Sequence, residues 1–252
     1  ILFGRYLLFE RISQGTLAEV WLASRQGREG YVAIKRLRPA LAKDAALQAL
    51  FVNEAKVAVQ LAHPNIAQVY DLGLANGDFY IELEYLAGTD LRAVLTRSAE
   101  GVMPWELAAH VAAQLCDALD HVHRKQGPTG VPLELVHRDV APDNVMLTFD
   151  GGVKLVDFSA AAGPGKLMPE RRGRSAYYSP ELLHCQVPDR RSDVYSVGVV
   201  LYEALTGRRL AAAPTEPGAS PAHCCKPVLP PRAVNRAIPA DLERIVLTAE
   251  AL

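Results

Sequence analysis

The sequence predicts an α+β fold with two lobes, a strand-rich first lobe and a mainly helical second lobe. Up to Leu86, short runs rich in Val, Ile, Leu and Tyr alternate with turn-forming residues. Beyond that point apolar residues recur at helical spacing, and Leu86-Ala87-Gly88 is typical of a hinge between the two patterns. We therefore expect an N-terminal lobe over residues 1–86 and a C-terminal lobe over residues 87–252.

The amino-acid composition limits the classes of protein to which the chain can belong. With 252 residues, half of them hydrophobic, the chain is long enough for two coupled lobes or for two small domains. A net charge of −1 gives no support for binding to nucleic acid, so we expect no nucleic-acid partner. The four cysteines have neither the density nor the spacing of a disulfide scaffold or a zinc site, which favours a cytoplasmic location.

The chain is expected to be a domain of a longer protein, because it opens on Ile1 without a start methionine or a signal-peptide pattern. No apolar run is long enough to cross a bilayer, so we expect no membrane span within these residues. Membrane anchoring of the parent protein outside them stays open.

The first lobe is expected to contain a five-stranded antiparallel sheet and one helix. Residues 6–37 predict three strands joined by hairpins, and residues 67–74 and 79–85 predict two more, joined at the hairpin signal Asn76-Gly77. Between them, residues 44–61 take a helical period that begins near Asp44 and ends before His63-Pro64.

The second lobe is expected to be helical around one hairpin. Helices are predicted over residues 90–97 and 104–125, within 194–205, and from Asp241 onward. Strands at 145–148 and 153–156 flank the turn Phe149-Asp150-Gly151-Gly152. Residues 211–239 are rich in proline and small residues, which predicts an extended surface loop.

Three polar groups point to phosphoryl transfer. Asp139 and Asn144 lie in the stretch that begins His137-Arg138, and Asp157 follows the predicted hairpin. Phosphoryl transfer needs Mg²⁺ on the phosphates, a carboxylate at the attacking hydroxyl and a cation near the phosphates. The alternative is that these side chains only cap turns, as Asp and Asn often do.

Two further charged residues suit a phosphate site. Lys35 ends the predicted strand Val32-Ala33-Ile34-Lys35, and Glu54 falls near the apolar face of its helix. An ion pair between them would orient the ammonium and offset the cost of burying either charge. Taken alone, each could be an ordinary surface residue.

These motifs, in their order along the chain, resemble the protein kinase family and in particular the eukaryotic-like serine/threonine kinases of bacteria. The resemblance covers nearly the whole chain and is carried by Ala33-Ile34-Lys35, Glu54, His63-Pro64-Asn65-Ile66, His137-Arg138-Asp139, Asn144, Asp157-Phe158, Ser179-Pro180-Glu181 and Ser192-Asp193-Val194-Tyr195-Ser196. It implies a bilobal kinase fold and an ATP-dependent serine/threonine kinase in signalling, which transfers the γ-phosphoryl group to a protein hydroxyl.

The resemblance also implies roles for individual residues. Asp139 would be the catalytic base or hydroxyl-orienting group, Lys35 would bind the α and β phosphates, and Asn144 and Asp157 would hold Mg²⁺, with Mn²⁺ as the alternative ion. Asp193 would brace the catalytic loop. The expected ATP-binding residues are Ile12, Gly15, Val20, Ala33, Lys35, Glu54, Leu83, Glu84, Leu86, Leu147 and Asp157.

The sequence departs from the family at supporting positions. Ser13 and Ala18 replace glycines of the phosphate-covering loop, Ser159 replaces a glycine after Phe158, and Ala141 replaces a lysine. Losing such a cation could slow transfer by about two to three orders of magnitude unless another cation, such as Arg174, replaces it.

The sequence leaves alternatives open for how the chain is regulated and for whether it is an active enzyme. Residues 160–174 contain no Ser, Thr or Tyr, so we expect control by a regulatory partner or by dimerisation more than by phosphorylation of this segment. The departures favour an alternative function as a pseudokinase, a nucleotide-binding or scaffolding module with little turnover. A small-molecule phosphotransferase is a weaker alternative.

Overall fold

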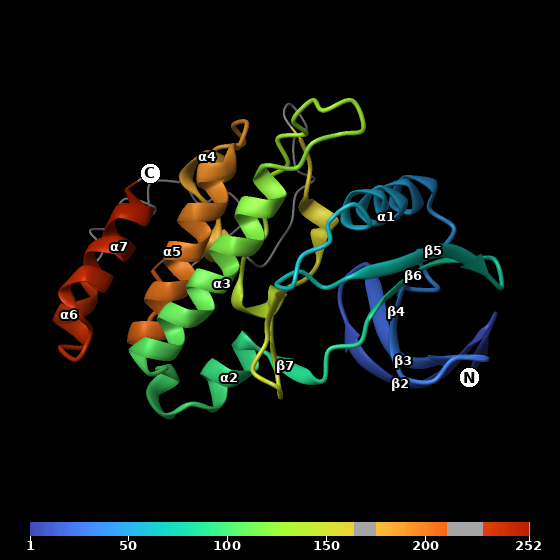
Figure 1. Cartoon of the computed structure of the whole chain (residues 1–252), viewed down its shortest axis with the longest axis horizontal. Helices are drawn as coiled ribbons and strands as arrows, with labels where there is room; N and C mark the ends of the chain where they lie inside the picture. Colours follow the sequence, from blue (N-terminus) through green and yellow to red (C-terminus); the bar gives the residue numbers. More distant parts are fainter. Residues whose placement is uncertain (164–174, 211–228, 252) are drawn as a thin grey trace. The chain divides into compact units, whose positions relative to one another are not determined.

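The computed structural model describes residues 1–163, 175–210 and 229–251 (Figure 1). The chain divides into two compact units, Ile1–Ala87 and Gly88–Leu252. This division lies one residue after the boundary expected from the sequence. Among the described residues, no helix has both the length and the apolar character needed to cross a bilayer.

The first unit is built on an antiparallel sheet whose strand order is β1-β2-β3-β4-β6-β5. The five predicted strands are present, and a sixth, β1, was not predicted because its two residues are too few to show a periodic pattern. The strands are β1 Leu2–Phe3, β2 Tyr6–Gln14, β3 Ala18–Arg25, β4 Val32–Leu37, β5 Val69–Ala75 and β6 Asp78–Glu84.

The Asn-Gly hairpin signal is confirmed between β5 and β6. Asn76 and Gly77 both have positive φ, 52° and 87°. Such a turn matches the twist of the paired strands, and Asn and Gly are the residues that tolerate its left-handed backbone.

The core of the first unit lies on the sheet face that carries Ile34. Tyr80 packs edge-to-face against Phe3 and Tyr6, with ring centroids 5.8 Å and 5.2 Å apart. Phe3 is buried, so β1 is held by side-chain packing as well as by its pairing with β2. The cluster comprises Phe3, Tyr6, Leu8, Ala23, Ile34, Ala75 and Tyr80.

The only α-helix within residues 1–87, all of which are described, is α1, Ala45–Ala58. Asp44 caps it, since its carboxylate accepts hydrogen bonds from the backbone N–H groups of Ala46 and Leu47. The helix ends before the predicted limit at residue 61. It buries Phe51, Glu54, Ala55 and Ala58, so a carboxylate lies within its apolar stripe.

The second unit is mainly helical. Helix α5 packs against both α3 and α7 (Figure 1) and is buried around most of its circumference. The α-helices are α2 Leu91–Arg97, α3 Trp105–His123, α4 Pro180–Leu183, α5 Arg190–Thr206, α6 Pro231–Val234 and α7 Ala240–Glu250. Single 3-10 turns lie at Ala99–Gly101, Pro142–Asn144, Phe158–Ala160 and Ser175–Tyr177.

The predicted hairpin of the second unit is part of a three-stranded sheet. Strands β8 Val145–Thr148 and β9 Val153–Leu155 form the hairpin, and β7 Gly88–Asp90, which was not predicted, pairs with β8. A Cβ on Gly88 would lie 2.1 Å from the carbonyl oxygen of Leu147, so only glycine allows this approach. In the expected loop at 211–239, residues 211–228 lie outside the described residues, whereas Pro231–Val234 form α6.

Glu250 on α7 is a buried carboxylate, and neither of its oxygens has a hydrogen-bond partner among the described residues. It lies against α5, where a Cβ on Gly198 would be 3.6 Å from the Glu250 Cγ. Burial raises the pKa of Glu250 from 4.5 to about 7.

The raised pKa predicts that this carboxylate destabilises the fold above neutral pH. The folded chain retains the proton where the unfolded chain loses it, so stability is lost as the pH rises from about 4.5 through about 7. Glu250→Gln should therefore unfold at a higher denaturant concentration than the wild type at pH 8 and at a similar concentration at pH 5. Asp241→Asn, at an exposed carboxylate of the same helix, should show no such difference. An effect of Glu250→Gln that is equal at both pH values would contradict this assignment.

Candidate nucleotide and catalytic site

Lys35 and Glu54 form a largely buried ion pair in the first unit. The Lys35 Nζ lies 2.5 Å from the Glu54 Oε1, and the two side chains are 13% and 8% exposed. The pair expected from the sequence is therefore present. It explains how α1 can bury a carboxylate, because the ammonium offsets the desolvation of the charge.

Four of the predicted ATP-binding residues share the sheet face that carries Lys35. Val20 on β3 is paired with Lys35 on β4, and Ala33 on β4 is paired with Leu83 on β6. Because paired residues in adjacent strands, and residues two apart in one strand, point to the same face, Val20, Ala33, Lys35 and Leu83 lie together. The sheet thus places an apolar surface beside the ammonium.

The remaining predicted residues of the first unit lie at the ends of strands. Ile12 lies in an irregular part of β2, and Gly15 begins the turn that leads to β3, where its N–H donates to the Ala18 carbonyl at 2.8 Å. The N–H of Glu84 donates to the Gln68 carbonyl at 2.8 Å. An adenine contact from Glu84 would therefore use its carbonyl oxygen, and Leu86 follows β6.

In the second unit the candidate catalytic stretch, residues 136–144, is ordered by its own polar side chains. The amide nitrogen of Asn144 donates to the backbone oxygen of Asp139 at 2.7 Å and to its Oδ2 at 3.0 Å. Both residues are buried, at 2% exposure each. Ala141 is fully buried, so no long side chain extends from this position.

Asp157 is brought beside Asn144 by the hairpin. The N–H of Val156 donates to the Asn144 carbonyl at 3.0 Å, which places Asp157 one residue beyond this bond. Asp157 has a left-handed backbone, φ 64° and ψ 78°, and its Oδ1 accepts a 2.5 Å hydrogen bond from the Ser159 hydroxyl. Leu147 lies on β8 in the same sheet.

These side chains fit a Mg²⁺ ion that is shared with phosphates. The Asn144 amide turns its nitrogen toward Asp139, so its carbonyl oxygen is the atom suited to a metal, and Asp157 supplies a carboxylate. Among the described residues, no three or more His, Cys, Asp or Glu side chains form a group that could hold a metal ion. A pair of oxygen ligands suits Mg²⁺, which commonly takes one or two protein ligands and completes its shell with phosphate and water.

Asp193 fixes the backbone of the catalytic stretch from within the core. Its carboxylate, fully buried at the start of α5, accepts 2.8 Å hydrogen bonds from the backbone N–H groups of His137 and Arg138. The Nε2 of His123 lies 2.8 Å from the same carboxylate. His137 in turn packs edge-to-face on Phe158, with ring centroids 4.8 Å apart.

Arg138 is buried and holds backbone carbonyls. Its guanidinium donates to the carbonyl oxygens of Ala162, at 3.3 Å, and of Gly163, at 2.9 Å. Burial lowers the pKa of Arg138, which the negative charge of Asp193 partly offsets. Its side chain therefore anchors the chain just before residue 164.

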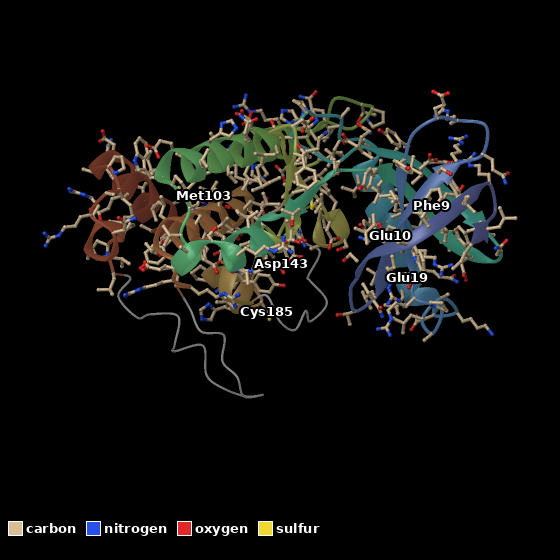
Figure 2. The ribbon with its side chains drawn as sticks, turned by 90° about the horizontal axis from the view of Figure 1, so that it is seen from below. Phe9, Glu10, Glu19, Met103, Asp143 and Cys185 are labelled. Carbon is tan, nitrogen blue, oxygen red and sulfur yellow. The ribbon has the colours of Figure 1, made fainter. Side chains whose placement is uncertain are left out.

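A partly buried polar network beside the candidate catalytic stretch was not predicted from the sequence. Arg92 on α2 donates to the Glu203 Oε1 at 2.7 Å and bonds to the hydroxyl of Tyr177, which also bonds to Glu203. The Arg92 Nε lies 3.6 Å from the Oδ2 of Asp143, and Figure 2 shows Asp143 beside the ribbon of α2. No local pattern could reveal this network, because Arg92 and Glu203 are 111 residues apart.

Glu181, of the motif Ser179-Pro180-Glu181, accepts a hydrogen bond from the Ser192 hydroxyl. Some of the residues singled out in the sequence lie outside the described residues. The expected basic substitute Arg174 and the neighbouring Arg171 and Arg172 lie outside the described residues, as do Cys224 and Cys225.

Comparison with known proteins identifies the family. The protein kinase domain family matches residues 6–228, so the chain belongs to the protein kinase family. It is a protein kinase domain homologous to bacterial serine/threonine kinases. The fold class predicted from the sequence is thereby confirmed.

Three of the similar proteins are from bacteria. The tyrosine-protein kinase MasK of Myxococcus xanthus is 35% identical over 99% of this chain and 40% of its own length. The serine/threonine-protein kinase PknB of Mycobacterium tuberculosis is 36% identical over 98% of this chain and 40% of its own length. The crystal structure of the Mycobacterium tuberculosis PknI kinase domain matches with a TM-score of 0.72 and 26% identity, over 99% of this chain and 89% of that one. The chain spans about two fifths of the length of MasK and PknB.

The geometry predicts that Asp193 supports the catalytic stretch through its charge. In Asp193→Asn the two backbone N–H groups lose a charged acceptor, so the free energy of unfolding should fall by about 2 kcal/mol or more. Asp189→Asn is the matched control, since Asp189 is an exposed helix cap that asparagine can replace, and it should change stability by less than about 0.5 kcal/mol. Urea denaturation of both variants measures the difference. Equal losses would show that the Asp193 charge has no special role.

Proposed function

We propose that the chain is the catalytic domain of an ATP-dependent protein serine/threonine kinase in signalling. The observation that carries the proposal is the direct hydrogen bond between Asn144 and Asp139, which joins a metal-type ligand to the candidate base. The Lys35–Glu54 pair supports it from the first unit. Every polar group that the general mechanism of phosphoryl transfer requires at the phosphates and the hydroxyl has a candidate.

The residues divide the work of the reaction. Lys35 would neutralise the α and β phosphates, and Val20, Ala33 and Leu83 would cover the adenine, together with Ile12, Leu86 and Leu147. Asn144 and Asp157 would hold Mg²⁺, which would supply positive charge to offset the negative charge that develops on the phosphates. Gly15 would approach the phosphates through its backbone.

Asp139 would orient the attacking hydroxyl of the protein substrate. A bond forms between the hydroxyl oxygen and the γ-phosphorus while the bond from that phosphorus to the β–γ bridging oxygen breaks, and ADP leaves. The proton of the hydroxyl passes to the Asp139 carboxylate. The Asn144 amide steadies this carboxylate through its bond to Oδ2.

Tyrosine is the second candidate acceptor. The name of MasK states a tyrosine kinase, whereas the names of PknB and the Bacillus subtilis kinase PrkC state serine/threonine kinases. The buried Ala141 replaces a lysine that serine/threonine kinases usually carry, and small residues occur there in tyrosine kinases.

We place the domain in the cytoplasm, where ATP is available, and propose that a regulatory partner or dimerisation controls its activity.

The proposal predicts that transfer depends on the Asp139 carboxylate. Incubation with labelled ATP, Mg²⁺ and a generic protein acceptor should label the acceptor, and Asp139→Asn should lower the rate by at least about two orders of magnitude. Asp143→Asn removes a charge from the same turn and should lower the rate far less. Hydrolysis of the product should yield mainly phosphoserine and phosphothreonine, and phosphotyrosine alone would favour the second candidate. Equal labelling by the wild type and Asp139→Asn would contradict catalysis and support the pseudokinase alternative.

A further inference from the structure

The turn between β2 and β3 is bounded by a buried charge. Glu19, at the start of β3, is 5% exposed and is paired across the sheet with Gln14 on β2 and Arg36 on β4. Its Oε1 accepts a 2.7 Å hydrogen bond from the Arg36 Nε, and its Oε2 lies 3.7 Å from an Arg11 nitrogen. Figure 2 shows Glu19 on the ribbon of the first unit. The carboxylate therefore ties three adjacent strands at the base of the turn.

Glu19 is ionised in this position. Burial alone would raise its pKa, but the neighbouring Trp21 and Arg36 side chains and the charge of Arg11 lower it below its usual value. Glu19 and Arg36 therefore form a pair of opposite charges, and removing either residue would leave the charge of the other poorly compensated.

Arg36 is itself held by aromatic rings. Its guanidinium carbon lies 5.3 Å from the ring centroid of Phe3 and 5.5 Å from that of Trp21. Cation–π contacts of this kind fix the orientation of the guanidinium. Phe3 belongs to β1, the strand that was not predicted, so β1 contributes to holding Arg36.

A second arginine of the same segment holds the turn itself. The backbone N–H of Arg38 donates to the Leu17 carbonyl at 3.0 Å, and its guanidinium lies 3.4 Å from the Thr16 carbonyl. Within the turn, the Gly15 N–H bonds to the Ala18 carbonyl. Both ends and the tip of the turn are therefore connected to β4, to Arg38 directly after it, or to each other.

The same segment carries Lys35. Successive side chains of a strand point to opposite faces, so Lys35 faces Glu54 on one side while Arg36 faces Glu19 on the other. A displacement of β4 would move the ammonium and the turn together. The segment Lys35–Arg38 thus couples the two.

We propose that Glu19, Arg36 and Arg38 form a positioning clamp that fixes the turn at residues 13–18 over the phosphates of ATP. The inference rests on the proposed nucleotide site and adds how its cover is held. In kinases, glycines let this turn approach phosphate. Here Ser13 and Ala18 restrict the backbone of the turn. The contacts with Arg36 and Arg38 set the position of the turn instead. The three residues are positioning residues and do not touch the reacting atoms.

Hydrogen exchange tests the clamp without any nucleotide. Glu19→Gln removes the charge at nearly constant volume, and Arg38→Ala removes the contact to the tip of the turn. In both variants the backbone amide protons of Gly15 and of position 38 should exchange at least about fivefold faster than in the wild type, because their partners lie in the turn. Lys43→Ala is the control, since it removes one exposed positive charge from the same unit, and it should leave these rates unchanged.

Nucleotide affinity tests what the clamp does. Titration calorimetry with Mg²⁺ and ATP should show about fivefold to twentyfold weaker binding in Glu19→Gln and Arg38→Ala, while adenosine, which lacks phosphates, should bind as to the wild type. General damage to the lobe would weaken adenosine equally and would overturn the proposal. Unchanged exchange rates would overturn it as well.

The binding and exchange measurements together distinguish a failure of the proposed nucleotide site from a failure of the clamp. If the wild type binds neither ATP nor adenosine, the proposed nucleotide site is wrong, and faster exchange in the variants would show only that the clamp holds the turn. If the wild type binds both and the variants bind ATP equally well, the nucleotide site stands and the clamp is wrong.

Discussion

The buried carboxylate of Asp193 is the constraint on which the candidate catalytic stretch of the second unit depends. A charge without solvent is stable only when donors surround it, and here the donors are two consecutive backbone N–H groups and an imidazole. These bonds hold the backbone of Arg138 at φ 68°, a left-handed conformation that a long side chain rarely adopts. Because Asp139 is the next residue after Arg138, Asp193 on α5 determines the direction in which the candidate base points.

The first unit follows the same principle with a pair of charges. Glu54 would be costly to bury on the apolar stripe of α1 alone, and Lys35 would be free to turn on its long side chain. Together they fix the position of the ammonium. Glu19 with Arg36 repeats the arrangement on the opposite face of β4, so the strand is held from both sides by ion pairs.

Much of the fold could be predicted because it depends on local patterns in the sequence. Alternation and the Asn76-Gly77 turn located the main strands, and the place of Glu54 among apolar residues indicated its need for a cation. The short strands β1 and β7 were not predicted, because two or three residues are too few to show a periodic pattern. Their pairing depends on the tertiary structure. The contacts of Arg92 with Glu203 and of Arg138 with backbone carbonyls escaped it too, since neither depends on neighbours in sequence.

We propose that Lys35, on the first unit, and Asp139, Asn144 and Asp157, on the second, act on one nucleotide. A crystal structure of the domain with Mg²⁺ and a non-hydrolysable ATP analogue tests it most directly. We expect the Lys35 ammonium within hydrogen-bonding distance of the α or β phosphate, and Asn144 and Asp157 as ligands of an ion on the same triphosphate. A nucleotide that contacts only one of the two units, or that binds elsewhere on the surface, would contradict the account.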